Sequence, residues 1–345
     1  MVIYSWIFIY RRRALTTMTK IKIKAIDVYH PQKTVFNEFY YDHFEKKGQN
    51  IVNFLEIMGR ENRFVIDNEE ENSITMAVEA SKQVLKKTGL TGNDIDMLVF
   101  STQVPEQTVP TNAIFLHHAI QGKKDMVIYD MNANCAGMTI AVEQASRYML
   151  SNPHVKTALV VGSDYLSLLA NPDDVMTYAN FGDASSAIIL EKTDEQSGFI
   201  DAMFEVDSDN RGNILYPEKG LSNTLRGKDK GDSMRWLPFD GAMSLPYVYK
   251  MFEKILKRNN MTIQDIDHFC LSQFAHVNIK KIQERFEIPD EKMIYVGDRY
   301  GYTGTSSPFV ALYEGIEAGK INRGDNLLFW TIGGGHEFVT MLFKY

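Results

Sequence analysis

Residues 131–138 read MNANCAGM, and the cysteine in this stretch, Cys135, decides how the rest of the chain is interpreted. The apolar run 126–129 before it is typical of a strand, and residues 136–150 carry apolar side chains at helical spacing. Cys135 is therefore expected on a strand-to-helix turn. There the positive end of the helix dipole favours the reactive thiolate and lowers the thiol pKa. The alternative is that Cys135 serves only as a small buried apolar side chain and has no catalytic role.

The composition is that of a globular enzyme. The chain has 345 residues, of which 44% are hydrophobic and 23% are charged, so it is neither disordered nor a disulfide framework. A net charge of -7 gives no electrostatic reason to expect nucleic-acid binding. Two cysteines in so long a chain suit a reducing compartment, so we expect both to be thiols in a cytoplasmic protein.

The first 17 residues differ from the rest of the chain. An apolar run at 2–10 is followed by arginines at 11–13. The run is too short to span a bilayer, and a secretory signal has its basic residues before the apolar stretch rather than after it. Residues 1–17 are predicted to be either a disordered leader or the result of a start codon assigned too far upstream. A weak membrane anchor is the alternative. No other segment resembles a transmembrane span.

An internal repeat organises the remaining sequence. Residues 91–101 read TGNDIDMLVFS, and residues 262–272 read TIQDIDHFCLS, so the two copies begin 171 positions apart. Gly162 and Gly333 end two later apolar runs and are separated by the same interval. Two landmarks at one spacing indicate two α/β halves related by duplication. The alternative is a coincidence among ordinary α/β segments.

The repeat predicts a domain boundary near residues 192–198, where the chain is polar and turn-forming. We therefore expect an N-terminal half over 18–195, which carries the cysteine, and a C-terminal half over 196–345. Helices that alternate with fully apolar strands predict mainly parallel sheets covered on both faces. Residues 208–237 are rich in Gly, Asp and Lys and are expected to form a surface excursion over a site.

Three consecutive glycines, Gly333 to Gly335, follow the last long apolar run. Residues without a Cβ at a strand end can present backbone N–H groups to a developing oxyanion, which is a large contribution to many acyl transfers. A tight turn with no catalytic role is the alternative. Neither a phosphate loop nor a dinucleotide fingerprint is present, and His117-His118 lacks spaced partner ligands, so no cofactor and no metal site are expected.

With these pieces, residues 21–345 resemble the 3-oxoacyl-acyl-carrier-protein synthase III family of the thiolase superfamily. The resemblance implies a homodimer of five-layered αβαβα subunits. It also implies that Cys135 is acylated by a thioester and that the N–H groups of Cys135 and Gly334 form an oxyanion hole. Val109 corresponds to a residue that reaches the partner's acyl pocket. The segments that carry the resemblance are NCAG (134–137), LVVGSD (159–164), FGDASSA (181–187), DRYG (298–301) and the glycine triplet.

The sequence departs from the family at two catalytic positions. Members that condense with malonyl thioesters have a His and an Asn where a gap-free alignment places Ser272 and Tyr302. A hydroxyl and a phenol donate hydrogen bonds but do not act as cations near neutral pH. Decarboxylative condensation is therefore in question. A four-residue shift would instead bring His276 to the vacant position.

Two further departures concern the second step and the acyl donor. His336, directly after the glycine triplet and beside Glu337, has the chemistry of a general base, and a half-buried polar pair is the alternative. The residues that sandwich the coenzyme A adenine in the family are also replaced. Arg60 and Arg63 lie nearby and are candidates to compensate by contacting coenzyme A or a carrier protein.

We therefore expect an acyltransferase that forms an acyl thioester on Cys135 and transfers the acyl group to a carbon or heteroatom nucleophile. Ser272, Tyr302 and His336 are the predicted catalytic residues of the second step. The substrate is an acyl-CoA or an acyl carrier protein. The first alternative is fatty-acid initiation, in which acyl-CoA condenses with malonyl-carrier protein. The second is a non-catalytic acyl-binding or scaffold protein.

Overall fold

The computed structural model describes residues 19–345 of the chain. The leader predicted over residues 1–17 lies outside the described residues. None of the helices between residues 19 and 345 is long and apolar enough to cross a membrane. Over the same range, no three His, Cys, Asp or Glu side chains gather as a set of metal ligands.

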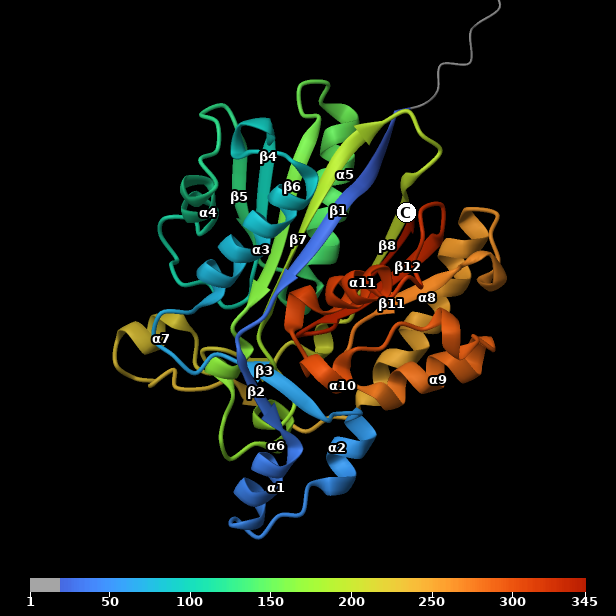
Figure 1. The fold of residues 1–345 in the computed structure, drawn as a ribbon. Helices are drawn as coiled ribbons and strands as arrows, with labels where there is room; N and C mark the ends of the chain where they lie inside the picture. The colour runs from blue at the N-terminus through green and yellow to red at the C-terminus, as the bar shows by residue number, and fades with distance from the viewer. Residues whose placement is uncertain (1–18) are drawn as a thin grey trace, which may run out of the picture.

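The first half of the chain forms a five-stranded sheet with the strand order β1-β7-β6-β4-β5 (Figure 1). The strands are β1 (Lys20–Tyr29), β4 (Met97–Ser101), β5 (Val127–Met131), β6 (Thr157–Asp164) and β7 (Ala184–Thr193). β4 pairs in parallel with β5 and β6, whereas β7 is antiparallel to β6 and β1. Every residue of β4 is buried, as expected for a central strand with both faces covered.

The second half forms a four-stranded sheet with the order β11-β12-β13-β8. Its strands are β8 (Gly198–Val206), β11 (His268–Leu271), β12 (Asn326–Gly333) and β13 (Glu337–Lys344). β11 and β12 are parallel, but β13 is antiparallel to β12 and β8. The prediction of mainly parallel sheets is therefore wrong. β12 and β13 are joined by three residues, and so short a link permits only antiparallel pairing.

Helices separate the two sheets and cover their outer faces (Figure 1). The middle layer consists of α5 (Gly137–Ser151) and α11 (Ser307–Glu317), which both contact strands of the two sheets. The outer helices are α3 (Ser73–Thr88) and α4 (Ala113–Ala119) on the first sheet, with α8 (Leu245–Arg258) and α9 (His276–Phe286) beside the second. This is the five-layered αβαβα arrangement expected from the sequence.

The duplication extends to individual hydrogen bonds. Thr91 donates from its backbone N and its Oγ1 to Asp94 Oδ2, over 2.8 and 2.7 Å. In the second half Thr262 donates in the same way to Asp265 Oδ2, over 2.7 and 2.8 Å. Each capping box stands immediately before a buried parallel strand, β4 or β11. Two such local arrangements at matching places support a common origin of the halves.

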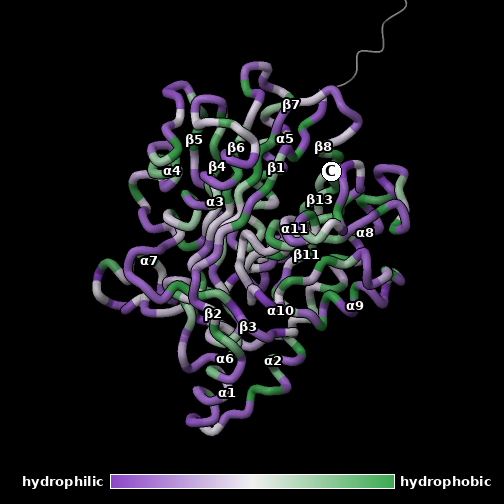
Figure 2. Tube along the Cα trace, viewed as in Figure 1, coloured by the Kyte–Doolittle hydropathy of each residue, from purple (hydrophilic) through white to green (hydrophobic). Residues whose placement is uncertain are grey.

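Two peripheral segments extend from the layered core. The first contains β2 (Lys33–Phe36), α1 (Asn37–Glu45), α2 (Val52–Met58) and β3 (Asn62–Val65). The second is the 208–244 excursion, with β9 (Ile214–Leu215), α7 (Leu221–Leu225) and β10 (Arg235–Trp236). Two short helices, α6 (Val175–Tyr178) and α10 (Gly297–Tyr300), complete the fold. Figure 2 shows hydrophilic residues on the outer loops of the molecule, and both peripheral segments supply residues to one cavity.

Candidate active site

Cys135 lies on a 3₁₀ turn (Asn134–Ala136) between β5 and α5, so its predicted strand-to-helix position is confirmed. Asn134 has a left-handed backbone, with φ of 50°. Its Nδ2 donates to the backbone oxygen of Gly334 over 3.2 Å, and Thr331 Oγ1 donates to the backbone oxygen of Cys135 over 3.2 Å. These bonds hold the end of β12 against the cysteine across a separation of 200 residues.

The glycine triplet forms the tight turn between β12 and β13. The backbone N of His336 donates to the Gly333 oxygen over 3.1 Å, and Gly335 has φ of 84°. A Cβ on Gly333 would lie only 3.1 Å from the backbone oxygen of Ala133, so the close approach of the two turns favours glycine. The turn brings the Gly334 backbone beside Cys135. The oxyanion hole of Cys135 and Gly334 stays a prediction that this proximity makes possible.

Gln103 contacts the Cys135 sulfur, although the sequence did not single it out. Its Nε2 lies 3.5 Å from Sγ and donates to Asp164 Oδ2 over 2.7 Å, while Oε1 lies 3.7 Å from Sγ. Buried Asp164 also accepts from the backbone N of Gln103 and of Thr305. Asp164 therefore fixes the amide that faces the sulfur. A polar residue just beyond the carboxyl end of a parallel strand is the signal that could have identified Gln103.

Burial raises the pKa of Cys135 to about 11. Hydrogen bonding by Tyr302 and Gln103 opposes this rise, while the negative charge of Asp164 adds to it. The expectation that the helix terminus would lower the pKa is therefore wrong for the protein without substrate. Removing the sulfur from bulk water outweighs the hydrogen bonds that would stabilise a thiolate. Cys135 remains partly exposed only because it faces an internal cavity.

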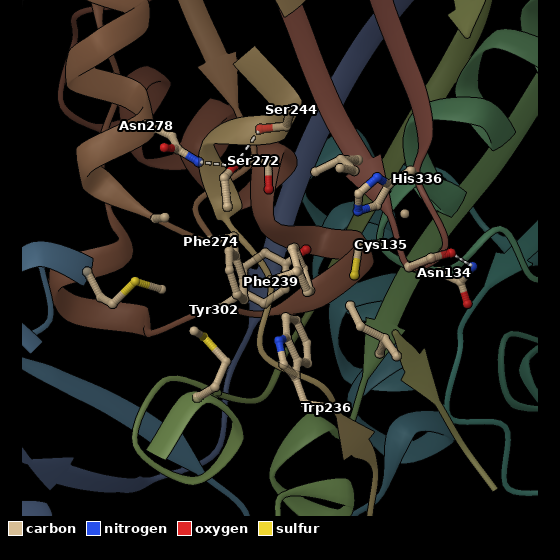
Figure 3. A pocket seen from close by; sticks show the side chains of 18 of the residues that line it. Asn134, Cys135, Trp236, Phe239, Ser244, Ser272, Phe274, Asn278, Tyr302 and His336 are labelled. Carbon is tan, nitrogen blue, oxygen red and sulfur yellow. Dashed lines mark hydrogen bonds between the residues drawn. The ribbon is translucent and has the colours of Figure 1, made fainter. Parts of the chain in front are cut away.

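Ser272 and Tyr302 line the same cavity as Cys135 (Figure 3). Ser272 directly follows β11, and its buried Oγ has no hydrogen-bond partner among residues 19–345. Burial holds the pKa of Tyr302 well above 10; the nearby Cys135 raises it further, and Ser272 lowers it. Both groups are neutral hydroxyls at pH 7 and can donate hydrogen bonds. Both residues that the gap-free alignment singled out therefore lie in the cavity that Cys135 faces.

His336 projects into the cavity from the turn before β13 (Figure 3). Its backbone is left-handed, with φ of 65°, and only 1% of the residue is exposed. Neither ring nitrogen has a hydrogen-bond partner within the described part of the chain. Burial lowers the pKa of His336, whereas the charge of Asp207 raises it. The side chain is thus a neutral imidazole with two uncommitted nitrogens in front of Cys135, and Glu337 is not among the residues that line the cavity.

The cavity has a volume of about 420 Å³ and is mainly apolar. Its walls come from both halves. Ile214, Tyr216, Met234 and Trp236 are among them, so the prediction that residues 208–237 cover a site is confirmed. The apolar residues that line the cavity and share an apolar cluster with Cys135 are Leu166, Leu169, Phe181, Ile214, Met234, Trp236 and Phe274. A deep apolar cavity with one nucleophile and a few polar groups is typical of a small-molecule site.

Comparison with known proteins identifies the family. Residues 129–208 match the family model described as 3-Oxoacyl-[acyl-carrier-protein (ACP)] synthase III, and residues 256–345 match the model of its C-terminal part. A beta-ketoacyl-[acyl-carrier-protein] synthase III of Clostridium perfringens is 30% identical over 332 residues, covering 95% of this chain and 100% of that protein. The chain belongs to the 3-oxoacyl-[acyl-carrier-protein] synthase III family. Membership makes it an acyltransferase.

Further relatives of the synthase III family agree. A beta-ketoacyl-[acyl-carrier-protein] synthase III of Koribacter versatilis is 28% identical, covering 96% of this chain and 99% of that protein. The crystal structure of a 3-oxoacyl-[acyl-carrier-protein] synthase III from Aquifex aeolicus superimposes with a TM-score of 0.81 at 23% identity, covering 95% of this chain and 100% of that one. The structural match confirms the thiolase-like fold.

Two residues predicted from the synthase III pattern lie away from Cys135. The ring of His276 stacks on Tyr295, with 4.2 Å between centroids, and His276 is not among the residues that line the cavity. Its alternative catalytic role is therefore contradicted, because the loop after β11 brings Ser272 to the cavity instead. Val109 is 83% exposed and lies outside this subunit's cavity. Its role in a partner's acyl pocket stays a prediction.

The proposed contact of Arg60 and Arg63 with coenzyme A or a carrier is wrong for both residues. Arg60 is 3% exposed and Arg63 is fully buried. Arg63 donates to Asn37 Oδ1 and to the Ala179 oxygen, and its guanidinium lies 4.1 Å from the centre of the Tyr40 ring. Both guanidinium groups are buried and donate to groups of the protein, so neither is available to a ligand at the surface.

Arg60 instead holds the loop that follows β11 in place. Its guanidinium donates to the Gln273 and Phe274 oxygens, each over 2.7 Å, immediately after Ser272 in the chain. The other accepting groups are Asn180 Oδ1, Tyr295 Oη and the Gly297 oxygen. The side chain therefore connects the first peripheral segment to the loop bearing Ser272.

Replacing Arg60 by methionine is expected to destabilise the protein by about 3 kcal/mol, because several buried oxygens lose a charged donor. The midpoint of urea unfolding measures this change. Replacing the exposed Arg226 by methionine is the matched control and should change the free energy of unfolding by less than about 0.5 kcal/mol. Equal midpoints for the two variants would contradict the structural role of Arg60.

Proposed function

We propose that Cys135 accepts an acyl group from an acyl-CoA or acyl-carrier-protein donor and passes it to a second substrate. The observation that carries this proposal is the position of Cys135, which faces the cavity with the Gly334 backbone held beside it. In the first step a bond forms between Sγ and the thioester carbonyl carbon. The donor thiol leaves with the proton of Cys135.

In the proposed second step the acceptor attacks the same carbonyl carbon, and His336 takes the proton that the acceptor loses. The thiolate of Cys135 leaves and recovers a proton from His336, which closes the cycle. The uncommitted ring nitrogens and the lowered pKa of His336 support this role, since a base must be neutral at the working pH. Ser272 and Tyr302 are proposed to donate hydrogen bonds to oxygens of the acceptor.

Fatty-acid initiation is the second candidate, and family membership favours it. An acceptor that loses carbon dioxide develops an enolate oxygen, which requires hydrogen-bond donors. The buried hydroxyl of Ser272, unpaired among residues 19–345, and the neutral phenol of Tyr302 are two such donors. These two hydrogen-bond donors carry no positive charge. We therefore expect this condensation to be slower than it would be if a positively charged side chain stabilised the enolate oxygen.

The mass of the intact protein after incubation with acyl donors tests the proposal. We expect an acyl adduct on Cys135 with at least one of acetyl-CoA, octanoyl-CoA, cinnamoyl-CoA and the corresponding acyl carrier proteins. Malonyl-carrier protein is then added. Loss of the adduct with formation of a 3-oxoacyl product supports initiation, whereas survival of the adduct supports a different acceptor. Absence of any adduct would favour the scaffold alternative.

We further propose a homodimer that forms along β5. This strand is at the edge of its sheet, and all five of its residues are partly exposed. Unpaired edges of this kind are templates for pairing with another chain. The exposed Val109 lies just before α4, which packs on β5, and is therefore well placed to reach a partner.

A further inference from the structure

Four aromatic side chains form a closed ring of contacts in the wall of the cavity: Phe181, Trp236, Phe274 and Tyr302. Their centroids are separated by 6.1 Å between Phe181 and Trp236 and by 5.3 Å between Trp236 and Phe274. The ring closes through Phe274 and Tyr302 at 5.0 Å and through Tyr302 and Phe181 at 6.3 Å. We call these four residues the aromatic ring cluster.

The aromatic ring cluster lies beside the nucleophile. Cys135 packs into the same apolar cluster as all four of its members. Phe239 extends the wall, since its ring stacks on Trp236 at 6.0 Å and meets His336 edge-on at 5.6 Å. Figure 3 shows Trp236, Phe239, Phe274 and Tyr302 gathered on one side of Cys135, with His336 on another. An acyl group on the sulfur is therefore in contact with aromatic faces and edges.

Aromatic walls distinguish between acyl groups of similar size. Any apolar chain gains from burial, but a planar π system also stacks or meets rings edge-on, which is worth about 0.5–1.5 kcal/mol per contact beyond the buried area. A saturated chain lacks this second contribution and loses more rotational freedom when it is ordered.

We infer that the acyl group loaded on Cys135 is planar and unsaturated, either an aryl group or a conjugated alkenoyl group. This inference rests on the proposed acyl transfer and specifies its substrate class.

A cation is the other ligand that aromatic walls attract. Asp240 is the acidic residue among those that line the cavity; it accepts a hydrogen bond from the backbone N of Ala242 over 2.9 Å and caps the following 3₁₀ turn. Lys281 also lines the cavity, and its positive charge disfavours a second cation. The charges around the cavity therefore favour a neutral planar group.

Binding to the full-length Cys135→Ala protein tests the inference without requiring transfer. The ligands are cinnamoyl-pantetheine and 3-cyclohexylpropanoyl-pantetheine, whose acyl groups have the same carbon skeleton, but only the cinnamoyl group is planar and unsaturated. Neither contains adenine, which could itself stack. Titration calorimetry is expected to give roughly three- to tenfold tighter binding of the cinnamoyl compound. A third titration, with 4-(trimethylammonio)butanoyl-pantetheine, tests whether the cavity prefers a cation.

The Trp236→Leu change, made in the same Cys135→Ala background, should bring the ratio of the two affinities close to one, and Trp236→Phe should keep the preference. Equal affinities in the Cys135→Ala parent, a preference unchanged by Trp236→Leu, or tightest binding of the trimethylammonio compound would each overturn the inference. Failure of the proposed function is a separate result, because it appears as absence of any adduct on unmodified Cys135. If planar ligands bind more tightly but no adduct forms on Cys135, the inferred binding specificity holds and the proposed acyl transfer does not.

Discussion

Replacing Cys135 by alanine is expected to abolish acyl-enzyme formation and to lower kcat on the order of 10⁶-fold, as loss of a covalent nucleophile does in other acyl-transfer enzymes. Cys135 is the cysteine whose sulfur faces the cavity. The sulfur contacts Gln103, and the neighbouring Asn134 binds the turn at Gly334, so the sulfur lies where a thioester carbonyl can approach. The mass of the intact protein after incubation with donor measures the adduct directly.

Cys270→Ala is the matched control for this prediction. Cys270 lies on β11, is fully buried, and has a pKa that burial raises further than that of Cys135. The Cys270 variant should therefore acquire the same adduct as the unmodified protein. An adduct that persists in Cys135→Ala, or that disappears in Cys270→Ala, would show that Cys135 is not the site of acylation.

The fold was predictable where local patterns determine structure, and less so where pairing between distant strands does. α8 forms where apolar residues recur at helical spacing, and β12 forms over an almost unbroken apolar run, so local sequence accounts for both elements. The directions of β7 and β13 were not predictable in this way. A fully apolar strand has the same composition in a parallel or an antiparallel sheet once both of its faces are buried.

The candidate site shows the same division. The place of Cys135 on its turn follows from the residues next to it in sequence, and the resemblance to the family supplied Ser272 and Tyr302. Trp236 and Gln103 were missed, because their roles depend on contacts between segments far apart in the chain. Trp236 lies on the excursion 208–244, which has weak periodicity.

The arginines show why proximity in sequence is a poor guide to ligand contact. Arg60 and Arg63 lie near the region expected to bind the nucleotide, yet folding directs both side chains inward. Burial lowers the pKa of Arg63 to about 10, while Tyr40 opposes this shift. A charge buried in this way is retained because the protein supplies its hydrogen-bond acceptors. Nothing in the local sequence distinguishes such a buried arginine from one at the surface.

Replacing His336 by asparagine is expected to lower turnover about 10²- to 10⁴-fold while acylation of Cys135 remains measurable, because a general base typically contributes that much. Asparagine is the better first substitution. His336 has φ of 65°, a left-handed conformation that asparagine tolerates and that costs alanine roughly 1–2 kcal/mol. His336→Ala should show the same loss of turnover. Steady-state kinetics and the mass of the acyl enzyme, measured on one preparation, separate the two steps.

The pH dependence of turnover gives a second readout of His336. Its pKa lies below 6.5 because burial disfavours the imidazolium, so the neutral base predominates at pH 7. As the pH falls through that pKa the ring becomes protonated, and turnover of the unmodified enzyme should fall with it. The residual turnover of His336→Asn should not show this acidic decline.

His276→Asn is the control, because its ring stacks on Tyr295 and does not line the cavity. It should leave both turnover and the pH profile unchanged. Unchanged turnover in His336→Asn would remove the residue from the mechanism. Loss of acylation together with turnover would instead place its action at the thiol of Cys135, whose raised pKa leaves little thiolate at pH 7. Comparing the rates of acylation and turnover therefore shows whether His336 accepts the proton of the Cys135 thiol or the proton that the acceptor loses.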